Sequence, residues 1–393
     1  MRKLIAASIV FCLCVFSFAQ DGSSLIEKYV KGNISDKTSA VREASGNDAV
    51  WLSTNAISFV LQSKQILKND RDLDGLAVAA VLSFPADYIK TTSSQNRELI
   101  LDNFMGLFLS FGGSTTVQTA VLNKTLACKQ SFSLSAFSSM INSYLVENDA
   151  GALDPGLVKS MILFLEETGN SESFNVIYNL RADNVLPAFK NELDEALLIL
   201  LGNSLNEAIS IIKQCEFQQA TDLCSMFFAK KDKISKNSLC NIAENLISKS
   251  ILYMENAGSL SKENEKVLDE AVGILNEFKW TRCADLLVSY FSNVKVLYEN
   301  GMYSEECYIR LIRSLNTVSS VKAVSPLIET LFQMNSRAET PGSVPGDVVL
   351  AVVQTLGAIG DKSAFDVLLA TTYYNYPEKV LSAAQLALAE LKW

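Results

Sequence analysis

Near the carboxyl end of the 393-residue chain stand the residue types that can hold a phosphate: Gly357, Gly360, Asp361, Lys362 and Ser363. A phosphate-binding P-loop needs four residues between its glycines, Gly-Lys-Ser/Thr directly after them, and a strand before the loop. Here two residues separate the glycines, an acid precedes the lysine, and the pattern before them is that of an amphipathic helix. We therefore predict a corner between two helices, in which both glycines end the first helix and Asp361 caps the second.

The chain contains no histidine. Because histidine is the most frequent general base and metal ligand, this composition excludes Ser-His-Asp and Cys-His hydrolases. Carboxylate chemistry stays open as an alternative, but the acidic residues lie on polar helical faces without a distinctive pairing. The cysteine and carboxylate spacing offers no zinc site. We expect a protein that is not an enzyme, with no catalytic residue, no cofactor and no metal.

Residues 1–19 have the organisation of a secretory signal peptide. Two positive charges precede the apolar run of residues 4–16, and the small residues Ser17 and Ala19 follow it. The run is shorter than the roughly 20 residues of a membrane span. We predict cleavage near Ala19, an exported mature chain without an integral membrane span, and a bacterial periplasmic location. An uncleaved signal that acts as an anchor is the alternative.

The charge balance limits the classes of partner. The chain has 34 basic and 43 acidic residues, a formal net charge of −9. A general basic field for nucleic acid is therefore absent, and we expect no nucleic-acid partner. Beyond the signal, each cysteine lies in an apolar helical pattern, which favours buried free thiols over disulfides. These cysteines are Cys128, Cys215, Cys224, Cys240, Cys283 and Cys307.

Helical periodicity dominates the chain after residue 20. Apolar residues recur three and four positions apart, and short stretches of Gly, Asn, Asp, Ser and Pro interrupt them. This pattern predicts an all-α fold of antiparallel helices joined by short turns.

Several of the predicted hairpins resemble one another. Displacements of 40 and 41 residues place Leu275, Leu315 and Leu356 on one template of helix, tight corner and second helix. A displacement of 63 residues relates Ile212 to Leu275 and leaves room for an extra helical pair at 237–257. Repetition with these periods is typical of stacked helical repeats.

The clearest copy resembles the HEAT repeat, especially its short bacterial variety. The resemblance rests on Leu356, Gly357, Ile359, Gly360, Asp361, Ala364, Phe365, Leu368 and Leu369, followed by the stretch EKVLSAAQLALAEL. It is good for residues 345–393, fair for 265–335 and weak for 158–230. It implies an irregular HEAT-like α-solenoid of stacked antiparallel helix pairs, elongated and curved.

The strength of the resemblance along the sequence divides the chain into regions. Residues 20–150 form an N-terminal helical region of divergent repeats, and residues 151–393 form the HEAT-like repeat region. Within the latter, we expect a loop at 335–346 outside the core and a capping helix at 377–393.

HEAT-like solenoids usually bind partners along their second helices. Ten residues after the key Leu or Ile, five units carry a polar residue, and we take these as candidate partner-binding positions: Asn175, Asp222, Asp285, Ser325 and Asp366. Solvated helix positions are the alternative. A second candidate is the cluster Tyr373, Tyr374 and Tyr376, because tyrosines make good interface anchors. Core packing is its alternative.

These observations favour an exported, non-catalytic scaffold that binds a protein or peptide partner along its solenoid surface. Two other functions stay open. One is an envelope enzyme or enzyme subunit that uses carboxylate chemistry, and the other is a helical carrier of an apolar ligand.

Overall fold

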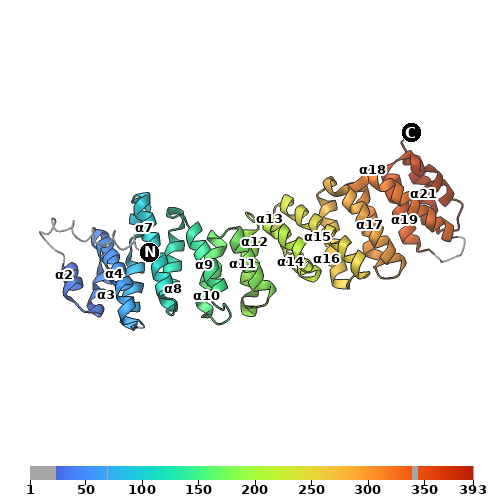
Figure 1. Ribbon diagram of the computed structural model, residues 1–393. Coiled ribbons are helices and arrows are strands. Elements are labelled where there is room, and N and C mark those ends of the chain that lie inside the picture. Colours follow the sequence, from blue (N-terminus) through green and yellow to red (C-terminus); the bar gives the residue numbers. More distant parts are fainter. Residues whose placement is uncertain (1–23, 69, 339–343, 393) are drawn as a thin grey trace. The chain divides into compact units, whose positions relative to one another are not determined.

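The protein has an all-α fold, as the sequence predicts (Figure 1). The computed structural model describes residues 24–68, 70–338 and 344–392. The predicted signal peptide lies outside these residues. The chain forms two compact units that divide between Ile199 and Leu200, within one helix. Each unit is described by itself.

Unit 1 is built from short and medium helices with polar caps. They are α2 (Ser24–Lys31), α3 (Ile34–Glu43), α4 (Gly46–Leu67), α5 (Arg71–Ser83), α6 (Ala86–Thr91), α7 (Ser94–Ser110), α8 (Thr115–Ala127), α9 (Ser135–Glu147), α10 (Pro155–Thr168), α11 (Ser171–Ala182) and most of α12 (Lys190–Leu200). Asn33, Asp70, Ser93, Asp154 and Asn170 each accept a backbone N–H at the start of a helix. Such caps satisfy donors that the helix itself leaves free.

The helices of unit 1 lie in two rows. One row runs α3, α5, α8 and α10, whose neighbours pack together. In the other row, α4 packs on α7 and α9 on α11. The edge of the Phe137 ring in α9 meets Phe108 of α7, with centroids 6.0 Å apart. Between the rows lies an apolar core in which both phenylalanines are fully buried.

Unit 2 repeats this arrangement with longer helices. They are α13 (Leu205–Gln214), α14 (Phe217–Phe228), α15 (Lys236–Ala257), α16 (Lys262–Glu277), α17 (Ala284–Glu299), α18 (Glu305–Arg337), α19 (Gly346–Ile359), α20 (Phe365–Thr371) and α21 (Glu378–Glu390). Short 3₁₀ turns precede α15, α17 and α20: η3 (Lys231–Lys233), η4 (Thr281–Cys283) and η5 (Lys362–Ala364).

Row A of unit 2 contains α13, α15, α17, the second half of α18, and α20. Lys295 of α17 donates to Gln333 of α18 at 2.7 Å, and Glu299 pairs with Arg337 four residues further along both helices. The two helices therefore run in the same direction. Asn335 continues the row by donating to α20.

Row B contains α14, α16, the first half of α18, α19 and α21. Glu265 and Asp269 of α16 accept from Ser304 and Arg310 at the start of α18. Thr355 of α19 lies against the Ile312 carbonyl of α18. Neighbours within row B are therefore parallel in the same way, and hairpin partners from the two rows are antiparallel.

Helix α18 reverses its direction, although it is helical without interruption over 33 residues. Near its start, Tyr308 stacks on Tyr298 of α17, and near its end Arg337 pairs with Glu299. A straight helix would hold Tyr308 and Arg337 roughly 40 Å apart. The middle of α18 lies at the start of α17, where Ser319 donates to the Ala284 carbonyl. The predicted corner after Leu315 is therefore present as a bend.

Pro326 lies inside α18 a few residues after the bend and lacks the N–H that would bond to the Lys322 carbonyl. The bend itself, at Ser319, contains no glycine.

The corner at Gly360 and Asp361 joins α19 to the helix that follows. Gly360 ends α19 with φ 72°, the left-handed conformation that glycine favours, and Asp361 Oδ1 accepts from the Ser363 N–H. The prediction for Gly357 as a helix end is wrong. Gly357 is buried inside α19, and a Cβ there would approach Ala387 Cβ of α21 to 2.7 Å. Its role is to let two helices pack closely.

Three further predictions need correction. The loop expected at 335–346 begins later, because α18 continues to Arg337 and Asn335 is buried within it. The extra helical pair expected at 237–257 is one helix, α15, since no turn residue interrupts its apolar stripe. Pro377 is the residue before α21 and not part of it.

All six cysteines beyond the signal are free, and only Cys215 is not buried. In the part of the chain that the structure describes, none of the helices combines the length and the apolar character that crossing a bilayer requires.

Candidate functional site: the row A surface

The row A surface is the solvent-exposed side of α15, α17, α18 after its bend, and α20 with the residues that follow it. Helices α15, α17 and α18 each contribute residues spaced four and three apart, which lie on one helical face, and Asp366 of α20 and Tyr373 in the turn after it complete the surface. They are Asn241, Asn245, Ser248 and Leu252; Asp285, Ser289, Ser292, Val296 and Glu299; Ser325, Glu329, Phe332 and Ser336; Asp366 and Tyr373. All from Leu252 onward are exposed.

One large apolar side chain stands near the end of each helical face. The exposed fractions are 60% for Leu252, 56% for Val296, 65% for Phe332 and 79% for Tyr373. Their neighbours on the same faces are mainly serine and asparagine, which are small, polar and uncharged. An exposed apolar residue is ordinary when single, but one on each neighbouring helix of a row forms a recurring feature.

Contacts between the helices place Val296 and Phe332 side by side. The Lys295–Gln333 hydrogen bond joins α17 to α18, and the two apolar residues immediately adjoin its two ends. Tyr373 follows α20 two residues after Thr371, which accepts from Asn335 at 3.0 Å. The apolar residues of three successive helices therefore lie near the same ends of those helices.

Ion pairs compensate most charges of the row A surface. Asp285 pairs with Lys322, and Glu299 pairs with Arg337 at 3.5 Å. Glu329 accepts only from Gln333, at 3.3 Å, and Asp366 has no ion-pair partner among the described residues. Lys295, next to Val296, donates to the neutral Gln333 amide and forms no ion pair within the described residues, so the uncompensated charges beside the apolar residues are of both signs.

The buried amide of Asn335 supports this surface from below. Its Nδ2 donates to the Val367 carbonyl at 3.3 Å and to Thr371 Oγ1, and its Oδ1 accepts from the Tyr376 hydroxyl at 3.2 Å. Asn335 is only 2% exposed. This network fixes α18 against α20 and against the turn before α21.

The three tyrosines that the sequence analysis grouped as one candidate interface differ in their exposure. Tyr376 is buried, 7% exposed, and burial raises its pKa to about 12. It belongs to the Asn335 network, where a partner cannot reach it. Tyr374 is half-buried with its ring edge toward Tyr376, and Tyr373 is exposed.

The structure brings together three of the five predicted polar positions. Asp285, Ser325 and Asp366 lie on the row A surface, while Asp222 lies on α14 in row B and Asn175 on α11 in unit 1. The 63-residue displacement contains three helices, an odd number, so that equivalent segments fall in opposite rows. All five side chains are exposed.

Sequence reasoning missed the apolar members of the surface. Phe332 lies seven residues after Ser325 on the same face of α18, whereas Tyr373 lies in the turn after α20. A large apolar residue among serines on a polar face is the signal that marks Phe332 in the sequence.

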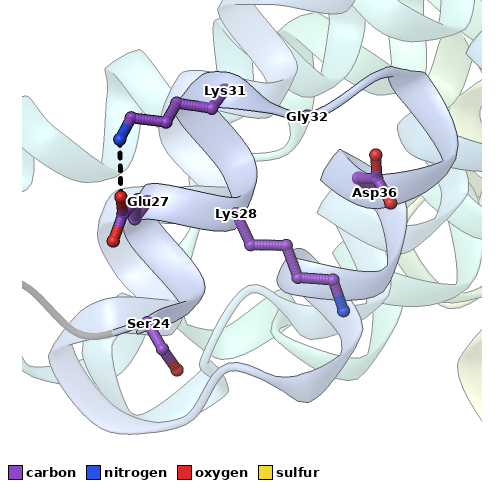
Figure 2. A pocket seen from close by; sticks show the side chains of 6 residues that line it. All are labelled: Ser24, Glu27, Lys28, Lys31, Gly32 and Asp36. Carbon is purple, nitrogen blue, oxygen red and sulfur yellow. Dashed lines mark hydrogen bonds and ion pairs between the residues drawn. The ribbon is translucent and has the colours of Figure 1, made fainter.

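A second candidate is an open depression on the α2–α3 hairpin, shown in Figure 2. Its charged groups already bind one another: Lys31 pairs with Glu27 at 2.6 Å, and Lys28 with Glu43 at 3.1 Å. Asp36 accepts from the Asn33 N–H as part of a capping box. The Lys31 ammonium lowers the pKa of Glu27. These contacts belong to the hairpin itself and leave no group aimed at a ligand.

A third candidate is a buried polar cluster between α16, α17 and α18. The hydroxyls of Tyr290 and Tyr303 lie 3.3 Å apart, and burial raises the pKa of both. Glu265 is the only charged side chain among the buried residues that the structure describes, and it accepts from the Ser304 N–H at 3.0 Å. The carboxylate therefore holds the start of α18.

Within the described ranges, no group of three or more Cys, Asp or Glu side chains is arranged to hold a metal ion. Comparison with known protein families finds no family model that matches the chain, and no curated protein matches it either.

Proposed function

We propose that the protein is an exported scaffold of HEAT-like helical repeats that binds a protein or peptide partner on the row A surface. The observation that carries the proposal is that Val296 of α17, Phe332 of α18 and Tyr373 in the turn after α20 are all exposed. Aromatic residues with adjacent apolar groups are the usual anchors of protein interfaces. The two rows of parallel helices in unit 2 support the interpretation of the chain as HEAT-like repeats.

Rigid helices hold these anchors in place. Lys295–Gln333 and Asn335–Thr371 fix neighbouring helices below the exposed side chains. A surface that is already ordered loses little conformational entropy on binding. The ion pairs Asp285–Lys322 and Glu299–Arg337 form a polar border.

A site-specific photo-crosslinker tests this function. The photoreactive amino acid replaces Phe332 or Val296 in the full chain, in the cells that naturally make it. Leu386 of α21 is a matched control, because it is 67% exposed but belongs to row B. We expect a discrete crosslinked protein at positions 332 and 296 and none at 386. The absence of an adduct at position 332, or the same adducts at all three positions, would contradict the proposal.

Export is tested separately by the amino terminus of the protein in fractionated cells. Cleavage near Ala19 predicts a mature chain that begins near Gln20 in the periplasmic fraction. A cytoplasmic protein that retains residues 1–19 would contradict export and leave the row A surface to be tested by crosslinking.

A further inference from the structure

We propose that unit 2 binds the surface of an anionic lipid bilayer through a basic corner, where the turn between α14 and α15 meets the turn between α16 and α17. The basic corner consists of exposed cationic side chains: Lys230, Lys231, Lys233, Lys236, Lys279 and Arg282. This contact goes beyond the proposed function, because it uses none of the apolar residues of the row A surface.

Contacts between the two turns bring these cations together. Lys231 of η3 pairs with Glu277, the last residue of α16, at 3.3 Å. The Lys236 ammonium, at the start of α15, lies over the Phe278 ring, 5.4 Å from its centroid. Lys279 follows Phe278 directly. Cations from two separate stretches of the chain therefore share one corner of unit 2.

Two of the six cations are in ion pairs. Lys231 pairs with Glu277, and Arg282 of η4 pairs with Glu244 of α15 at 2.7 Å. Burial raises the pKa of Glu270 in α16, and the nearby Lys231 ammonium opposes that shift. Lys231 and Arg282 are therefore the cations that meet the carboxylates of α15 and α16.

The other four cations leave the corner with an excess of positive charge. They have no ion pair within the described residues: Lys230, Lys233, Lys236 and Lys279. Asp232, between two of them, is the remaining acidic residue of the corner, and the neighbouring pair Asp285–Lys322 is neutral. Six positive and four negative charges thus meet in a chain whose formal net charge is −9. An anionic surface would attract this corner and repel most of the molecule.

The residue types of the corner favour a lipid surface over an anion of defined shape. Five of the six cations are lysines, whose ammonium groups are mobile point charges, whereas arginine recognises a single phosphate or carboxylate with a fixed fork. The guanidinium of Arg282 is already held by Asn241 and Glu244. Clusters of four to eight such cations are typical of surfaces that bind anionic headgroups.

Two half-buried aromatic rings lie among the cations. The Arg282 guanidinium lies over the Trp280 ring, 4.8 Å from its centroid, and the Trp280 indole N–H donates to Glu244 at 2.7 Å. Phe278 lies beneath Lys236. Tryptophan, with an apolar body and one polar N–H, is favoured where a bilayer meets water. The corner therefore combines cations with a ring type that suits this interface.

Vesicle sedimentation tests the proposal with the full chain. One set of vesicles contains phosphatidylcholine alone, and the other contains equal parts of phosphatidylcholine and phosphatidylglycerol. At low ionic strength we expect binding to the anionic vesicles to be about tenfold tighter or more, and added salt to release the protein. Equal binding to both vesicles, or binding to neither, would overturn the inference.

A matched pair of charge reversals assigns the binding to the corner. Lys230→Glu/Lys233→Glu should weaken binding to the anionic vesicles about tenfold or more. The control Lys262→Glu/Lys266→Glu makes the same change in net charge with two exposed lysines at the start of α16. Because the start of α16 lies about 20 Å from its end, beyond the Debye length, this control should leave binding nearly unchanged.

The comparison between variants also separates other causes of binding. Residues 1–19 are identical in both double variants, so any contribution that they make to vesicle binding cancels. Equal losses in the two variants would show that net charge alone, and not the corner, determines binding. Fluorescein-labelled polyglutamate distinguishes an acidic protein segment from a bilayer. If polyglutamate binds through Lys230 and Lys233 while anionic vesicles do not bind, an acidic partner replaces the lipid surface.

Discussion

The Asn335 amide of α18 donates to the Thr371 hydroxyl of α20 at 3.0 Å, and both side chains are buried. The contact lies directly beneath the row A surface. It joins two residues that are 36 positions apart in the chain, on helices that share no hairpin.

Replacing Asn335 with leucine should destabilise unit 2 by about 1–3 kcal/mol, because the Tyr376 hydroxyl loses its acceptor in a buried place. Hydrogen exchange should show faster opening of α20 than of α14. The control Ser336→Ala changes an exposed neighbour and should cost less than about 0.5 kcal/mol. Equal costs for both variants would show that the network contributes nothing.

Gly357→Ala should destabilise the protein by about 1–3 kcal/mol despite the better helix propensity of alanine, because the new Cβ would collide with Ala387. Gly273→Ala in α16 is the control, since nothing lies within 4 Å of the Cβ position there, and it should stabilise by about 0.5–1 kcal/mol. Urea unfolding measures both. Adding Ala387→Gly should restore part of the loss, and a stabilising Gly357→Ala would refute the close-packing role.

Alkaline pH should weaken the packing around Tyr376. Its folded-state pKa of about 12 exceeds the ordinary value of 10 for the free phenol, so folding favours the neutral form. This contribution is complete below pH 10 and is lost as the pH rises from 10 to 12. Tyr376→Phe should lose about 1 kcal/mol less stability than the wild type between pH 8 and 11. Identical pH dependence of the two proteins would contradict this assignment.

Alkylation by iodoacetamide at pH 8 should modify Cys215 before the other five described thiols. Cys215 is half-exposed, whereas burial both shields Cys283 and raises its pKa to about 12. Since the thiolate is the reactive form, the buried thiols should react only as the protein opens. Peptide mass spectrometry follows each site, and fast modification of Cys224 in the native protein would be incompatible with the core.

The sequence predicts those parts of the fold that local chemistry determines. The helical periodicity, the left-handed Gly360 and the Asp361 cap all follow from neighbouring residues. The role of Gly357 depends on Ala387, 30 residues away, and could not be read from its local pattern. The bend of α18 was located by the repeat, but the repeat did not show that the chain stays helical through it.

The candidate site was predicted less completely for the same reason. Asp285, Ser325 and Asp366 follow from the repeat template. The template does not show that an odd number of helices separates Asp222 from Asp285, and it therefore grouped Asp222 with them. The importance of Phe332 depends on the Lys295–Gln333 contact beside it, which only the folded chain shows.

The α18 bend also has a consequence for chain insertion and proteolysis. Most hairpins of unit 2 are joined by exposed residues outside regular helices, where an inserted epitope or a protease cut is tolerated best. Between Leu315 and Ala323 the chain turns without leaving the helix, and Ser319 binds the Ala284 carbonyl. An engineer who wishes to split or tag unit 2 should therefore choose the mostly exposed residues between α15 and α16, because the bend provides no loop in which added residues could be accommodated.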